Sequence, residues 1–139
     1  MVAYIRAGTS PAPTENLEEV MGYVDGFVLT VPKKKLQDYR RIAQKAGKIW
    51  KEHGALDYKE CSGDDLNVEW GITFPRMTKL KRDETVVFSW ILYKSRAHRD
   101  QVNAKVMKDP RLEKMMDPKN MPFDMKRMAY GGFKVLVQI

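Results

Sequence analysis

Asp124, Lys126 and Arg127 come just before the stretch Tyr130-Gly131-Gly132-Phe133. An arginine presents a planar fork of donors that fits a carboxylate or a phosphate. Asp124 and Arg127 are therefore candidates for an anion or carboxylate site at the mouth of the barrel predicted below. The structural alternative is that Asp124 caps the turn after Pro122 and pairs locally with Arg127. We favour this alternative, because structural ion pairs perturb charges as often as functional ones do.

Gly131 and Gly132 lie inside a predicted strand, where glycine loses more conformational entropy than other residues. One explanation is a bulge that bends the sheet toward barrel closure, and the other is the close approach of a ligand or a neighbouring backbone. We favour bending, because a curved sheet needs such a device.

Four more residues complete the set of ligand-binding candidates: Tyr130, Arg76, Trp90 and His53. Aromatic walls with a few polar groups are typical of small-molecule pockets, and Trp90 and Arg76 fit that pattern. Core and interface packing is the commoner explanation for the aromatic residues. His53 is predicted at a helix C-terminus, where a positive charge is favourable. No catalytic residue can be named from the sequence.

The sequence contains no nucleophile elbow, phosphate loop, paired metal carboxylates or dinucleotide fingerprint. Two histidines far apart and a single cysteine, Cys61, argue against a zinc site. We therefore expect no metal and no cofactor, and we interpret Cys61 as a buried structural residue.

The net charge of +7 and the pI near 9.5 raise the question of nucleic acid. The lysines are spread over a predicted helix surface and a hairpin, as on an ordinary solvated face. The stretch "AYGGFKVL" differs from the aromatic-glycine octamer of RNA-recognition modules, because no basic residue opens it and Lys134 occupies an aliphatic position. RNA binding remains the weakest alternative.

A chain of 139 residues is typical of one domain. Residues 1–20 contain two prolines and an acidic stretch, and we expect a flexible N-terminal arm or leader followed by a single domain over 21–139. The longest mostly apolar run, Val86 to Tyr93, is strand-sized, so no membrane span is expected. We expect a cytoplasmic protein.

Hydrophobic periodicity predicts the elements. Residues 23–31 read as a central strand, and residues 33–54 form one apolar helical stripe that ends at Gly54. A short strand is predicted over 55–61. Further predicted elements are a half-buried strand over 68–74, the strongest strand over 85–93, a helix capped by Ser95 and interrupted at Asp109-Pro110, and a last strand over 127–137.

This order predicts an α+β, ferredoxin-like βαββαβ fold, with an antiparallel four-stranded sheet and helices on one face. The other face would carry apolar side chains such as Phe27 and Trp90. A patch of that size normally marks an interface, so we expect a homodimer through the sheet faces, as a dimeric α/β barrel.

Five stretches together resemble the YbaA-like family of small bacterial proteins, a domain of unknown function. They are "YVDGFV" (23–28), "GALDYKEC" (54–61), "ETVVFSWI" (84–91), "SRAHRDQVNAKVMKDPR" (95–111) and "MPFDMKRMAYGGF" (121–133). The resemblance runs from about Tyr23 to the C-terminus. It implies the dimeric α/β-barrel superfamily, in which two ferredoxin-like subunits join their sheets. It implies a fold and no mechanism.

The first functional hypothesis is a homodimeric α/β-barrel protein that binds or transforms a small organic molecule, without a metal, in a cleft between sheet and helices. The alternative is a non-catalytic structural or stress-related dimer, whose sheet face serves only as an interface. A polar-mouthed pocket favours the first, and a closed apolar interface without a cavity favours the second.

Overall fold

The computed structural model describes residues 22–139. The prediction of an arm over residues 1–20 lies outside the described residues. The principal elements are β1 (Tyr23–Pro32), α1 (Leu36–Glu52), β2 (Asp57–Ser62), β3 (Glu84–Tyr93), α3 (Arg96–Met107) and β4 (Ala129–Lys134). Four shorter elements are η3 (Lys33–Lys35), α2 (Phe74–Met77), α4 (Pro110–Met115) and η4 (Met125–Arg127).

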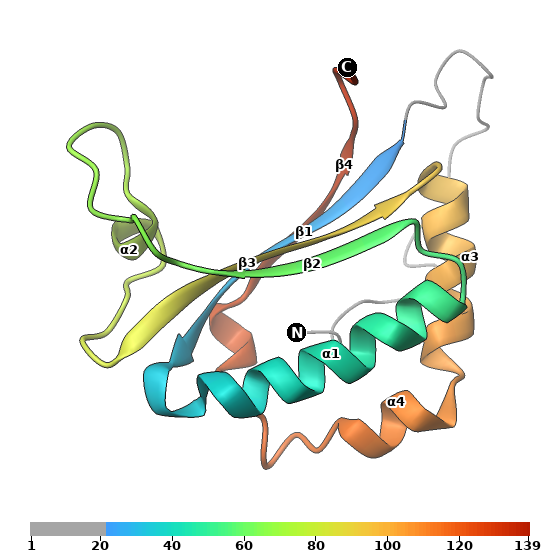
Figure 1. Cartoon of the computed structure of the whole chain (residues 1–139), viewed down its shortest axis with the longest axis horizontal. Coiled ribbons are helices and arrows are strands. Elements are labelled where there is room, and N and C mark those ends of the chain that lie inside the picture. Colours follow the sequence, from blue (N-terminus) through green and yellow to red (C-terminus); the bar gives the residue numbers. More distant parts are fainter. Residues whose placement is uncertain (1–21) are drawn as a thin grey trace.

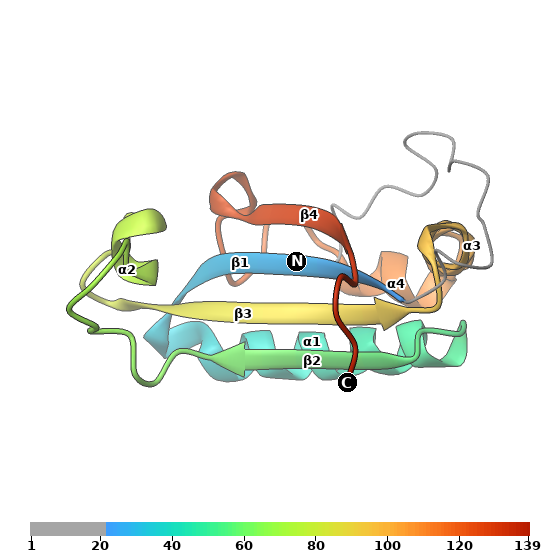
Figure 2. The same ribbon diagram turned by 90° about the horizontal axis from the view of Figure 1, so that it is seen from above.

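The four strands form one antiparallel sheet in the order β2-β3-β1-β4. Figure 1 shows α1, α3 and α4 on one side of this sheet, and Figure 2 shows the strands side by side with α1 behind them. This is the ferredoxin-like arrangement, so the predicted fold is confirmed. The sheet of one chain is open, and its two edges are β2 and β4.

The apolar stripe of α1 buries Tyr39, Ala43, Ala46, Ile49 and Trp50 against the sheet. The predicted end of the helix is confirmed: His53 is the C-cap, and Gly54 follows with φ of 117°. That left-handed conformation favours glycine.

The two faces of the sheet differ in burial. Alternate residues of β1, from Tyr23 to Val31, point toward the helices and are buried. The prediction that Phe27 lies on the open face was wrong, because Phe27 is on the helix side and only 1% exposed. The open face carries Phe88, Trp90 and Phe133, of which Phe88 is 45% and Phe133 61% exposed.

The predicted strand over 68–74 was wrong. Residues 63–73 form a loop without strand structure, and Phe74 begins the short helix α2. The Thr73 hydroxyl caps α2 by accepting from the Arg76 backbone N–H, and Pro75 fits the first turn of a helix. The apolar-polar alternation was misleading, because among residues 22–139 no strand pairs with this connection.

The glycine pair in β4 does not form the predicted bulge. The ladder between β1 and β4 is continuous, from Tyr23 opposite Lys134 to Val28 opposite Ala129. A Cβ at Gly132 would lie 2.2 Å from the Tyr23 hydroxyl oxygen. Gly132 therefore makes room for a side chain of the adjacent strand.

Candidate functional site

A groove with a volume of about 710 Å³ lies between α1 and the edge strand β2. The α1 side contributes positions spaced three and four residues apart, which share one flank of the helix. The β2 side contributes Tyr58, Glu60 and Ser62, which alternate toward the helices, together with Cys61. The lining residues are Leu36, Gln37, Tyr39, Arg40, Ala43, Gln44, Gly47, Lys48, Lys51, Glu52, Tyr58, Glu60, Cys61, Ser62 and Val87.

The polar centre of the groove is the carboxyl group of Glu60. The Tyr39 phenol donates to Oε1 and the Tyr58 phenol donates to Oε2, each at 2.6 Å. Glu60 lies opposite Ser89 of β3 and so points toward the helix layer. Two strands and one helix therefore converge on a single carboxyl group.

Burial raises the pKa of Glu60, although hydrogen bonds from Tyr39, Tyr58 and Ser89 act in the opposite direction. Burial, followed by the charge of Glu60, raises the pKa of both tyrosines, so the phenols stay protonated and keep donating. Within residues 22–139 no Lys, Arg or His forms an ion pair with Glu60. Only neutral donors satisfy this carboxyl group in that part of the chain.

Gly47 allows the ring of Tyr58 to lie directly against α1. A Cβ at this position would lie 2.8 Å from two ring atoms of Tyr58. Helix-interior glycine is costly relative to alanine, and here it permits the close approach that brings the phenol to Glu60.

The rim of the groove is basic. Arg40, Lys48 and Lys51 project from α1, and the Lys51 ammonium donates to the Leu56 carbonyl at 2.7 Å. Cys61 lies at the β2 end of the groove and is exposed, so its prediction as a buried residue was wrong.

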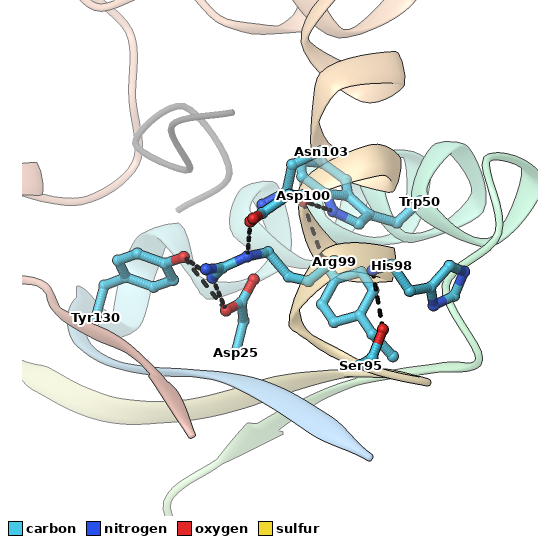
Figure 3. A network of polar contacts seen from close by, with 9 residues as sticks. Asp25, Trp50, Ser95, His98, Arg99, Asp100, Asn103 and Tyr130 are labelled. Atoms are coloured by element: carbon cyan, nitrogen blue, oxygen red, sulfur yellow. Dashed lines mark hydrogen bonds and ion pairs between the residues drawn. The ribbon is translucent and has the colours of Figure 1, made fainter. Parts of the chain in front are cut away.

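A second polar cluster lies under the helices nearer to β4 (Figure 3). Arg99 of α3 donates through Nη1 to Oδ1 of Asp25 at 2.6 Å and to the Tyr130 phenol oxygen at 3.0 Å. Asp25 is fully buried and Arg99 is 8% exposed. The Tyr130 ring stacks on Phe27 with centroids 4.9 Å apart and closes the cluster on the β4 side.

This cluster continues into the core through Asn103. The Trp50 indole N–H and the Tyr93 phenol both donate to Oδ1 of Asn103 at 3.1 Å. Oδ2 of Asp25 and Nδ2 of Asn103 are buried and make no hydrogen bond that meets ordinary geometric criteria. Burial raises the pKa of Asp25, against the lowering by Arg99. Burial lowers the pKa of Arg99, but Asp25 and Asp100 outweigh it, so the guanidinium stays charged.

Comparison with known proteins gives the family. A family model described as "Protein of unknown function (DUF1428)" matches residues 22–125. The chain belongs to the DUF1428 family. It is 45% identical over 117 residues to "Uncharacterized protein YbaA" of Escherichia coli strain K12, covering 84% of this chain and 98% of that protein. The protein of the same description from Shigella flexneri gives the same values. The predicted YbaA-like family is confirmed.

Two solved structures are similar to this chain. This DUF1428 chain is similar to a dimeric ferredoxin-like protein from an uncultured marine organism, with a TM-score of 0.50, 12% identity, and coverage of 85% and 99% of the two chains. It is also similar to an uncharacterized NIPSNAP domain protein from Burkholderia xenovorans, with a TM-score of 0.48, 14% identity, and coverage of 80% and 91%. At this identity, the first likeness supports the ferredoxin-like fold alone.

Asp124 and Arg127, which were predicted from the sequence as a possible anion site, have different partners in the structure of this DUF1428 chain. Asp124 caps η4 by accepting from the Lys126 backbone N–H at 3.0 Å, as the structural alternative predicted. Arg127 does not pair locally. Its fork binds both carboxylate oxygens of Glu84, at 2.6 and 3.0 Å, and also the carbonyls of Thr78 and Lys79. These contacts use the donors of Arg127, and they link the start of β4 to the connection between β2 and β3.

The other four candidates are dispersed. Tyr130 joins the Asp25–Arg99 cluster, whereas Trp90 lies on the open face with Lys59 5.1 Å from its ring centroid. His53 meets Asp109 at 2.8 Å, and Arg76 is exposed on α2. None of the six candidates is among the residues that line the groove.

Sequence reasoning missed Glu60 and Arg99. Tyr39 was assigned to the apolar stripe of a helix, where its hydroxyl gave no signal. A usable signal was present for Asp25, which interrupts an otherwise apolar central strand. A buried charge requires a partner, and the sequence offered many arginines from which to choose.

The described part of the chain contains neither a metal-binding cluster nor a membrane-spanning helix. Residues 22–139 contain no group of three or more His, Cys, Asp or Glu side chains placed to hold a metal ion. None of the helices in this range has the length and apolar content that a bilayer crossing requires.

Proposed function

We propose that this DUF1428 protein is a homodimer that binds a small organic molecule in the groove between α1 and β2. The groove carries the proposal. Its volume of about 710 Å³ falls within the range of roughly 300–1,000 Å³ that small-molecule sites occupy. It combines apolar and aromatic walls with a few convergent polar groups, which is the usual composition of such sites.

The charges of the groove favour an acidic ligand. Both oxygens of Glu60 already accept phenol hydrogen bonds, so the interior offers mainly the ring faces of Tyr39 and Tyr58 and the side chain of Val87. Arg40 and Lys48 at the rim attract an anion. An aromatic or aliphatic carboxylic acid would place its apolar body inside and its carboxylate at the rim.

The open sheet face supports the dimer. Phe88 and Phe133 expose large rings on it, and contiguous apolar patches on soluble proteins usually mark interfaces. In Figure 1 the loop that carries α2 and the C-terminal end both rise on the side of the sheet away from α1. Trp70 in that loop is 81% exposed and Leu136 in the tail is 88% exposed. A second copy would cover these surfaces, and the similar marine protein is described as dimeric.

Ligand binding is tested by native mass spectrometry of the purified protein, followed by thermal-shift screening with small carboxylic acids. Lys48→Glu places a negative charge at the rim and should weaken binding of an acid. Lys105→Glu makes the same charge change on the exposed side of α3 and serves as the matched control. Equal weakening by both variants, or no shift with any acid, would contradict the proposed ligand class.

The dimer is tested separately by light scattering after size exclusion. Phe88→Asp should give a folded monomer, because it places a charge on the proposed interface. Leu56→Asp, at an exposed residue of the α1–β2 connection, should leave the dimer intact. A monomeric wild type at micromolar concentration would refute the dimer. A dimer that never binds a ligand would favour the purely structural alternative.

A further inference from the structure

A second hollow lies on the opposite flank of α1. Its volume is about 650 Å³, and it opens between α1 and the segment after α4, which runs back along α1 in Figure 1. We call it the basic cleft. Its lining residues are Lys35, Asp38, Arg41, Ile42, Lys45, Lys114, Met115, Lys119, Asn120, Met121 and Pro122.

The basic cleft concentrates positive charge. It contains four lysines and one arginine against a single acid, Asp38, which already forms an ion pair with Arg41. None of the four lysines forms an ion pair with any residue between 22 and 139. Like charges gathered around one hollow repel one another, so an anion bound among them relieves that repulsion.

The arrangement differs from an ordinary lysine-bearing helix face. Lys35 and Lys45 come from the first half of the chain, whereas Lys114 and Lys119 come from a segment about seventy residues later. The fold brings the two groups to opposite walls. The cleft is also lined by four apolar residues, Ile42, Met115, Met121 and Pro122.

We infer that the basic cleft binds a compact polyanion of the polyphosphate type, either inorganic or carried by a nucleoside. Lysine ammonium groups act as point-charge phosphate ligands. Several of them converging on a hollow of this size suit a ligand that carries several charges over a short length. The apolar lining residues could contact an organic group beside the phosphates. The site does not depend on the groove or on the dimer.

Inorganic tripolyphosphate is the probe, with titration calorimetry at low and at physiological salt. The double variant K114Q/K119Q removes two exposed cleft lysines, and K105Q/K108Q removes two exposed lysines from α3 and its C-cap. Both variants have the same net charge. The cleft variant should bind about thirtyfold more weakly than wild type, because it loses two charge contacts of on the order of 1 kcal/mol each, and about 1.4 kcal/mol is a factor of ten. The control should bind as wild type does, and circular dichroism melts show whether both fold.

Equal weakening in both double variants would overturn the site and leave only diffuse attraction by net charge. Absence of tripolyphosphate binding at low salt would overturn it directly. A single-stranded RNA that binds far more tightly than tripolyphosphate, and loses that binding in K114Q/K119Q, would replace the small polyanion with nucleic acid.

Discussion

Asp25 and Glu60 point to the same face of one sheet, yet their carboxyl groups have opposite surroundings. Asp25 is fully buried and pairs with the guanidinium of Arg99, and its Oδ2 makes no hydrogen bond of ordinary geometry. Glu60 lies beside a groove, and both of its oxygens accept from tyrosine phenols. One carboxylate is neutralised inside the core, and the other is held by neutral donors at a surface hollow.

The different surroundings indicate a structural role for Asp25 and a candidate functional site beside Glu60. A buried charge that has an ionic partner fixes the packing of the elements that carry the two groups, here β1 and α3. A carboxyl group held by neutral donors can change its protonation without leaving a buried cation unpaired. We therefore propose that the ligand binds in the groove beside Glu60, and that Asp25 has a structural role.

The largest effect should come from breaking the Asp25–Arg99 pair. Arg99→Met leaves a buried, unpaired carboxylate, and we expect a loss of about 3–5 kcal/mol in the free energy of unfolding. Urea unfolding measures it. The double variant D25L/R99M should recover much of the loss, because an apolar pair carries no unpaired charge. Wild-type stability in R99M would show that the pair does not hold β1 to α3.

Gly47→Ala tests how tightly the groove is built. The added Cβ meets the Tyr58 ring, and overpacking of about 1–3 kcal/mol outweighs the gain in helix propensity of up to about 1 kcal/mol. We expect net destabilisation in urea and displacement of Tyr58 from Glu60.

Gly131→Ala is the matched control, because a Cβ there makes only an ordinary contact at 3.6 Å. A Gly47→Ala protein more stable than wild type would mean that the groove wall is free to move.

Tyr130→Phe should have a smaller effect, about 1–2 kcal/mol, the usual net value of two hydrogen bonds. It removes the hydroxyl that accepts from Arg99 and donates to Oδ1 of Asp25 at 3.3 Å, and it leaves the ion pair between Arg99 and Asp25 in place. Chemical denaturation of this variant, beside R99M, gives the share of the cluster that Tyr130 contributes. A loss as large as that of R99M would show that the Tyr130 hydroxyl contributes as much stability as the Arg99–Asp25 ion pair.

The smallest effect concerns pH. The pKa of Glu60 is raised above its ordinary 4.5, so its folded form holds a proton more tightly than the unfolded chain. Its contribution to stability is then greatest at low pH and is lost as pH rises from 4.5 through the raised value. Relative to wild type, Glu60→Gln should gain stability over that window, measured as Tm against pH.

Asp109 provides a control of opposite sign. Hydrogen bonds from Arg111 and His53 lower its pKa below the ordinary 3.8. Its contribution is present above pH 3.8 and is lost as pH falls through the folded pKa. Asp109→Asn should therefore lose stability at neutral pH and approach wild type in acid. The same slope in both variants would contradict the assigned pKa directions.

Local patterns predicted much of the fold. The stripe of α1 and its end at Gly54 were confirmed, as were the cap at Ser95 and the antiparallel four-stranded sheet. The alternation over 68–74 failed, because an alternating pattern forms a strand only where another strand is available to pair with it.

The candidate site was predicted less well. Of the six proposed residues, only Tyr130 belongs to a buried polar cluster, and Arg127 is occupied by Glu84, which lies 43 positions away in the sequence. The bulge proposed at Gly131 and Gly132 was wrong, because the ladder between β1 and β4 is continuous. At Gly132, the crowding comes from the hydroxyl of Tyr23 on the neighbouring strand.

The sequence by itself determined most of the helices and strands, with residues 68–74 as an exception, because periodicity, capping residues and glycine positions act between near neighbours. Only the tertiary structure decided which carboxylate receives a cation and which receives phenols. Asp25 meets Arg99 across 74 positions and Glu60 meets Tyr39 across 21. Such contacts depend on sheet register and helix placement, so the partner of each carboxylate cannot be predicted from the residue types alone.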